Sequence, residues 1–214
     1  MKTEKQKLSQ SLLLLKILET DNNIFGNLKL QKQVFLNELT LTRSNIGALY
    51  YKYFCYNYGP FSADLMDDYN VLAHKGFIHK TTYSLTERGE YLIEYIEGSI
   101  RKHKNNEHIF RKVEKTTERY KRYNGTELMQ KVYRLVVEPE DMPGQSMKVK
   151  DIPAFKDILM PECHEFKYAL KIPPRILDDV KTELAMDQDE WGNLERTRAD
   201  AVEDATKSLM RELS

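Results

Sequence analysis

The chain has 214 residues, and its 33 basic and 33 acidic side chains give a formal net charge of zero. A hydrophobic content of 41% with 31% charged residues is typical of a globular protein, and the longest apolar run, residues 12–15, is far below the roughly 20 residues that cross a bilayer. Cys55 and Cys163 are the only cysteines, which excludes a disulfide framework. The start lacks the apolar stretch of a secretory signal. We therefore expect a cytoplasmic protein with no membrane partner.

Two helices and a strand are predicted in the first 58 residues. Leucines on several sides of residues 7–19 predict a helix that is buried on more than one side. A second helix begins near Asn27, with Leu30, Val34 and Phe35 on its apolar side. The aromatic-rich residues 50–58 partly alternate, which indicates a strand.

The next 30 residues predict a turn, a helix and a hairpin. Gly59 and Pro60 form a turn, Ser62 follows as a helix N-cap, and apolar residues recur at helical spacing until Gly76. Residues 77–80 and 83–85 are predicted as two short strands, after which Thr86 caps another helix. Together with the two earlier helices, this order predicts a winged helix.

The composition changes beyond residue 100. Residues 101–134 hold eleven basic and four acidic side chains, a net charge of +7, whereas residues 135–214 hold eleven basic and eighteen acidic side chains, a net charge of −7. This asymmetry indicates a polyanion-binding segment, two parts that attract each other, or simply solvated helix faces.

The predicted fold is therefore mainly α: a winged-helix-like N-terminal domain of helices and a short β-hairpin, with a helical C-terminal extension. Four prolines and Gly144 predict a linker between the two charged parts of the extension. The predicted units are a winged-helix-like domain at residues 7–100, a basic helical segment at 101–137, a proline-containing linker at 138–161 and an acidic helical region at 162–214.

Several short patterns of the first half resemble a known family. The patterns are Leu28-Lys29-Leu30-Gln31-Lys32, Tyr58-Gly59-Pro60-Phe61-Ser62, Gly76-Phe77-Ile78, and Tyr83-Ser84-Leu85-Thr86 with Gly89. As a set they resemble the small prokaryotic proteins related to YwgA and, more distantly, the SocA-like (Panacea) antitoxins, over roughly residues 8–100. The resemblance implies a winged-helix-like fold, a non-enzymatic role and a phage-associated or toxin–antitoxin setting. It also implies a protein partner such as a toxin, a protease or another complex subunit.

The third predicted helix carries acidic side chains where a DNA-reading helix places basic or amide groups. Asp64, Asp67 and Asp68 would repel phosphates, and affinity for DNA depends mainly on neutralising phosphate charge. The hairpin tip adds only Lys80 as a nucleic-acid-binding candidate. We therefore interpret the three aspartates as candidates for a protein interface, while their favourable interaction with the helix dipole is the structural alternative.

A helix predicted at residues 107–123 carries a basic stripe. Arg111, Lys115, Arg119 and Arg122 recur at three- and four-residue steps and are the main nucleic-acid-binding candidates. The alternative is a solvated helix stabilised by pairs at i and i+4, such as Glu107 with Arg111. In a third interpretation, the acidic C-terminal region covers this basic stripe, either within one molecule or across a homodimer.

Aromatic residues supply the other interface candidates. Tyr51 and Tyr53 belong to the predicted strand and would form a tyrosine surface, with core packing as the alternative. Trp191 and Leu194 lie in a sparse apolar stripe of a predicted last helix, which is typical of docking on a neighbour.

The sequence carries no recognised catalytic or metal-binding pattern. The five histidines and two cysteines form no ligand spacing for zinc, and no glycine-rich phosphate loop occurs. We predict no catalytic residues, no metal and no cofactor. The favoured hypothesis is a non-enzymatic regulatory binding protein, namely an antitoxin, an adaptor or a regulatory subunit. The alternative is a DNA-binding winged-helix transcription regulator that uses residues 107–123 for phosphate contacts.

Overall fold

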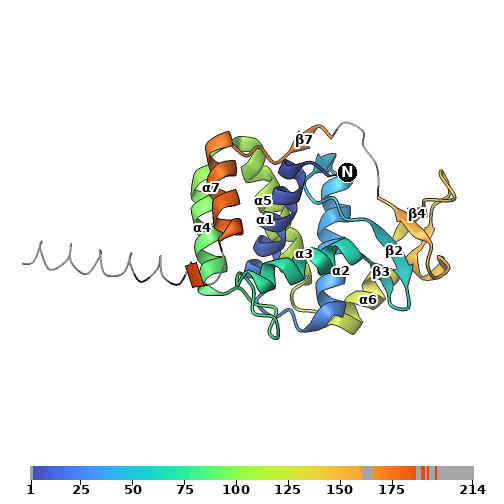
Figure 1. Cartoon of the computed structure of the whole chain (residues 1–214). Helices are drawn as coiled ribbons and strands as arrows, with labels where there is room; N and C mark the ends of the chain where they lie inside the picture. Colours follow the sequence, from blue (N-terminus) through green and yellow to red (C-terminus); the bar gives the residue numbers. More distant parts are fainter. Residues whose placement is uncertain (1, 161–165, 187–188, 191, 193–195, 197–214) are drawn as a thin grey trace, which may run out of the picture.

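The computed structural model describes residues 2–160, 166–186, 189–190, 192 and 196. Within these residues the protein is mainly helical, with two small sheets at the surface of the helical body (Figure 1). The helices are α1 (Glu4–Thr20), α2 (Gly26–Thr42), α3 (Ala63–His74), α4 (Glu87–Ile100), α5 (Lys104–Tyr120), α6 (Gly125–Tyr133) and α7 (Pro174–Ala185), with a short 3₁₀ helix η1 (Val149–Asp151).

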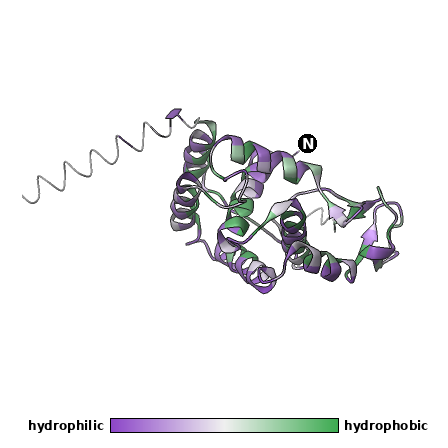
Figure 2. Cartoon of the chain, turned by 90° about the horizontal axis from the view of Figure 1, so that it is seen from below, coloured by the Kyte–Doolittle hydropathy of each residue, from purple (hydrophilic) through white to green (hydrophobic). Residues whose placement is uncertain are grey.

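Helix α1 lies at the centre of the core, as its leucine-rich sequence predicts. Thr3 and Gln6 form a capping box at its start. The helix contacts α2, α3, α4 and α5, so its leucines are buried on every side rather than along one stripe. Figure 2 shows hydrophobic and hydrophilic residues alternating along the helices, as expected where a helix buries one face.

The predicted order of turn, helix, hairpin and helix is present between residues 58 and 100. The Ser62 hydroxyl accepts a hydrogen bond from the Leu65 N–H and caps α3, while Gly76 ends the helix with φ at +77°. The hairpin is shorter than predicted, because only a single antiparallel bridge joins Ile78 and Leu85. The Thr86 hydroxyl then caps α4 as expected.

Residues 136–159 differ from the expected linker. They contain β4 (Val136–Pro139), β5 (Met147–Lys148) and β6 (Asp157–Leu159), which join β2 (Tyr53–Tyr56) and β3 (Gly59–Phe61) in one sheet of order β3-β2-β6-β4-β5. All neighbours in this sheet are antiparallel. Proline has no N–H to donate, but it is tolerated here because Pro139 is the last residue of its strand. The next residue, Glu140, donates its N–H to the Asp157 carbonyl at 2.9 Å.

The described part of the acidic region folds back onto the N-terminal helices. Strand β7 (Tyr168–Ala169) pairs in parallel with β1 (Ile46–Gly47), and α7 packs along α4 at the end of the molecule opposite the larger sheet (Figure 1). Buried Arg88 joins two helix ends, since its guanidinium donates to the Lys75 carbonyl after α3 and to the Met186 carbonyl after α7. A cation at a helix C-terminus is favoured by the helix dipole.

Candidate interaction surfaces

The polar residues at the start of α2 are buried and bind backbone groups of other segments. Lys29 forms an ion pair with Asp21 at 2.9 Å, and both side chains are almost fully buried. The same ammonium group donates to the carbonyls of Asn23 at 2.8 Å and Lys121 at 2.9 Å. Lys29 therefore joins the turn after α1 to the end of α5.

Three further side chains of α2 act in the same way. Gln31 both donates to the Ser62 carbonyl and accepts from the Ser62 N–H, each at 2.9 Å, which fixes the start of α3. The Lys32 ammonium donates to the Pro60 carbonyl at 2.7 Å, and burial lowers its pKa to about 8. Gln33 donates to the Thr117 carbonyl of α5. Lys29, Gln31 and Lys32 belong to one of the sequence patterns noted above, and all three make structural contacts.

Glu38 is a carboxyl group in the core. It is fully buried and accepts a hydrogen bond from the Tyr51 N–H at 2.9 Å. Burial raises its pKa to about 8, because removal from water disfavours the charged form. At neutral pH it is therefore mainly a neutral acid.

The three aspartates of α3 have different surroundings. Asp64 forms an ion pair with Lys2 at 2.9 Å. Half-buried Asp68 accepts from the Tyr51 hydroxyl at 3.1 Å, and burial raises its pKa. Asp67 is exposed, and no interaction of its side chain is found among the described residues. The acidic face of α3 is therefore narrower than the sequence indicates.

Tyr51 and Tyr53 are not on the surface, so their proposed role in a tyrosine interface is wrong. Their side chains are 2% and 1% exposed, and the Tyr53 ring packs edge-on against Phe35 at 5.0 Å. Register explains the error. Tyr53 pairs with Ile158 of β6 on the inner face of the sheet, so the even-numbered residues of β2 point outward.

The outer face of this sheet carries an aromatic cluster instead. Phe54 contacts Phe61 at 5.5 Å between ring centroids, and Tyr56 contacts both Phe61 at 6.0 Å and Phe155 at 5.5 Å. Tyr56 is 42% exposed and Phe155 is 70% exposed. We call Phe54, Tyr56, Phe61 and Phe155 the aromatic face.

Phe155 is held in a backbone conformation that suits glycine better. Its φ is +64°, and its N–H donates to the Cys55 carbonyl at 2.6 Å. Left-handed backbone at a residue other than glycine costs on the order of 1–3 kcal/mol. No local pattern in the sequence indicates this residue, because Phe155 lies a hundred positions from β2 and within the expected linker.

The predicted basic stripe lies on α5 and the turn that follows it. Arg111, Lys115, Arg119 and Arg122 are all exposed. Arg111 pairs with Glu107 as expected. Glu118 pairs with Lys121, and Arg122 donates to the Tyr123 hydroxyl at 2.7 Å. Lys80 is exposed at the hairpin tip, far along the chain from this stripe.

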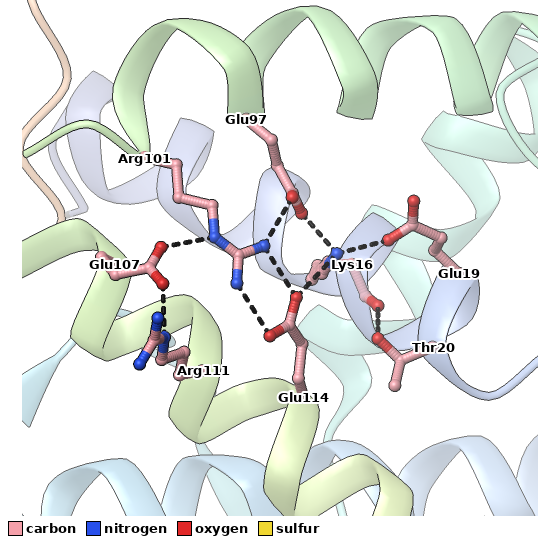
Figure 3. Close-up of polar contacts among 8 residues, drawn as sticks. All are labelled: Lys16, Glu19, Thr20, Glu97, Arg101, Glu107, Arg111 and Glu114. Atoms are coloured by element: carbon pink, nitrogen blue, oxygen red, sulfur yellow. Dashed lines mark hydrogen bonds and ion pairs between the residues drawn. The ribbon is translucent and has the colours of Figure 1, made fainter.

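A network of ion pairs lies between α1, α4 and α5 (Figure 3). The Lys16 ammonium contacts Glu97 at 2.5 Å and Glu114 at 3.1 Å, while Arg101 bridges the same two carboxylates, both at 2.8–2.9 Å. Burial opposes ionisation of Lys16, but hydrogen bonds to its glutamate partners outweigh this and raise its pKa. Charges on this side of α5 are therefore neutralised within the molecule, unlike those of the outward stripe.

Trp191 and Leu194 lie outside the described residues, as does Cys163. In the part of the chain that is described, no group of three or more histidine, cysteine, aspartate or glutamate side chains is placed to hold a metal ion, and no helix is long and apolar enough to span a bilayer. Cys55 is buried, and burial raises the pKa of its thiol to about 11. A buried thiol of this kind is a poor nucleophile.

Comparison with known proteins adds no further constraint. A scan against protein-family models finds no match to this chain, and neither curated proteins nor solved structures give one.

Proposed function

We propose that this protein is a non-enzymatic regulatory binding protein whose winged-helix-like N-terminal part contacts a protein partner. An antitoxin, an adaptor or a regulatory subunit of a prokaryotic or phage-associated system fits the resemblance of residues 8–100. The observation that carries the proposal is the aromatic face, in which the rings of Tyr56 and Phe155 are largely exposed to solvent.

Aromatic residues are the usual anchors of protein interfaces. They bury a large area for little loss of conformational freedom, and truncation of such anchors often removes most of the binding energy. Phe155 also occupies a backbone conformation that costs free energy without adding burial to this chain. Strain of this kind is common at sites of function.

The surroundings of α3 favour a protein partner over a DNA groove. Asp67 remains exposed, and Asp64 is only partly neutralised by Lys2, because both side chains of that pair are open to solvent. Carboxylates placed against a phosphate backbone would oppose binding.

Phe155→Gly is the sharpest test. Glycine adopts a positive φ without strain, so we expect the variant to be at least as stable as the wild type while a face anchor is lost. Tyr56→Ser removes the neighbouring ring. The matched control is Phe25→Ser, which removes a ring that is 74% exposed at the start of α2, outside the aromatic face.

Products of adjoining genes are co-expressed with each tagged variant, and retained proteins are quantified by mass spectrometry. The proposal is supported if Phe155→Gly and Tyr56→Ser each retain at least tenfold less of one partner than the wild type, while Phe25→Ser retains it fully. Calorimetry with the purified pair then confirms the interaction. Equal retention by all variants would contradict the role of the aromatic face. Sequence-specific binding of duplex DNA through α3 would contradict the proposed function itself.

A further inference from the structure

Four cations near the end of α5 have no carboxylate partner among the described residues. Lys115 and Arg119 lie on the outward side of the helix, Arg122 follows in the next turn, and Lys131 lies on α6. We call them the cationic surface. Two neighbouring cations are neutralised: Arg111 pairs with Glu107, and Lys121 pairs with Glu118. The cationic surface is therefore a local excess of charge in a chain whose net charge is zero.

Two of these cations converge on one phenol ring. The Arg122 guanidinium donates to the Tyr123 hydroxyl at 2.7 Å, and the Lys131 ammonium lies 4.1 Å from the centre of the same ring. Hydrogen bonds from Arg122 and then Lys131 lower the pKa of Tyr123, as a positive local potential requires. Tyr123 holds two like charges together, and an anion bound beside them would relieve their repulsion.

The remaining two cations extend this site along α5. Arg119 stacks on the Tyr120 ring at 5.4 Å, which limits the conformations of its side chain. At 1.5 Å per residue, Lys115 to Arg122 span about 10 Å along the helix axis. One strand of a duplex presents about three phosphates over that length.

We propose that the cationic surface binds the phosphodiester backbone of a nucleic acid without reading its sequence. Two planar guanidinium groups suit phosphate oxygens, to which arginine donates two hydrogen bonds at once. A row of cations along one line fits the regular charges of a nucleic-acid strand better than the irregular charges of an acidic protein. This site lies on elements other than the aromatic face, so its function is independent of the protein-binding role proposed above.

The test is a salt titration with the full chain. Binding to a labelled 20-nucleotide single strand and to a 20-base-pair duplex of mixed sequence is followed by fluorescence anisotropy from 50 to 200 mM NaCl. Three or four phosphate contacts predict a slope of log K against log salt between about −2 and −3.6. The two oligonucleotides distinguish a single-stranded from a double-stranded source of the same phosphates.

Matched pairs of substitutions locate the site. Arg122→Gln/Lys131→Gln removes two contacts and should make the slope shallower by about 1.4 to 1.8. The control, Lys52→Gln/Lys148→Gln, changes the net charge equally at two exposed lysines near the larger sheet and should leave the slope unchanged. Thermal melts establish that both are folded. If the first pair does not fold, Arg119→Gln should still reduce the slope by about 0.7 to 0.9.

Three outcomes would overturn the proposal. The first is the absence of salt-dependent binding to either oligonucleotide at 50 mM NaCl. The second is an equal loss in both pairs of variants, which would mean that net charge alone causes the binding. The third is tighter binding to a poly-glutamate peptide of matched charge, because the surface would then serve an acidic protein.

Discussion

Helices α2 and α5 are both 17 residues long and both carry many polar side chains, but they use them in opposite ways. On α2 the polar side chains are buried and bind the backbone of neighbouring segments, as Lys29 and Gln31 do. On α5 the polar side chains of the outward face are exposed, and Lys115 has no partner among the described residues.

The difference follows from the position of each helix in the core. Helix α2 is covered by α5, α6, α1 and β3, so most of its polar side chains are out of contact with water and bind partners inside the protein. Helix α5 packs against α1 and α2 with one side only. The polar side chains on its other side can form their hydrogen bonds with water. A lysine therefore indicates a binding surface only where the helix that carries it has a free side.

The largest effect is expected for Lys29→Met. The substitution leaves the Asp21 carboxylate buried without its cation and removes donors from two carbonyl groups, so we expect a loss of about 3–5 kcal/mol in the free energy of unfolding. Urea denaturation measures it. Asp21→Asn/Lys29→Met, which also removes the buried negative charge, should recover part of the loss. A loss below about 1 kcal/mol for the single variant would show that α2 does not depend on this contact.

Glu38→Gln should stabilise the protein at neutral pH. The folded pKa of Glu38, about 8, is raised above its ordinary value of 4.5, so its contribution to stability is complete below pH 4.5 and is lost as the pH rises to about 8. Each pH unit in that window costs about 1.4 kcal/mol, or about 3 kcal/mol by pH 7. The glutamine keeps the acceptor for the Tyr51 N–H and does not ionise.

Urea denaturation of wild type and Glu38→Gln at pH 5, 6, 7 and 8 isolates this group, since other titrating residues cancel in the difference. The advantage of the variant should grow with pH and then level off above pH 8. A difference that does not change with pH would mean that Glu38 is ionised in the folded protein.

Thr117→Val tests the point where the two helices meet. Its hydroxyl accepts from the Asn37 amide at 3.0 Å, and the valine would leave that buried amide with one hydrogen bond fewer. We expect a loss of about 1–3 kcal/mol. The adjacent Thr116→Val is the matched control, because Thr116 is also buried but no side-chain hydrogen bond of it is found in the described part of the chain. If both variants lose the same free energy of unfolding, the effect comes from packing and not from the hydrogen bond.

Much of the helical architecture could be predicted from the sequence, because local signals determine it. The caps Ser62 and Thr86 and the helix end at Gly76 lie where the sequence predicts them. Whether α1 to α4 form a winged helix stays a prediction.

The larger sheet and the face it carries could not be predicted in the same way. Strands β4 and β6 have four and three residues and lie among prolines. Strand β6 forms only through pairing with β2, about a hundred residues earlier, and β4 pairs in turn with β6. The same pairing decides which tyrosines are buried. Alternation along β2 predicts that either its odd-numbered or its even-numbered side chains are exposed. Only the pairing of Tyr53 with β6 determines which of the two sets faces the core.

The smallest expected effect, and the most direct comparison of the two helices, comes from Lys115→Met. It is the same substitution as Lys29→Met, but Lys115 is exposed on the outward side of α5. We expect the free energy of unfolding to change by no more than about 0.5 kcal/mol. The two variants, measured in one urea series, would then differ by several kcal/mol although their chemistry is identical. A loss above about 1 kcal/mol at Lys115 would mean that this side of α5 is packed against other parts of the molecule, and the cationic surface would not be free to bind a nucleic acid.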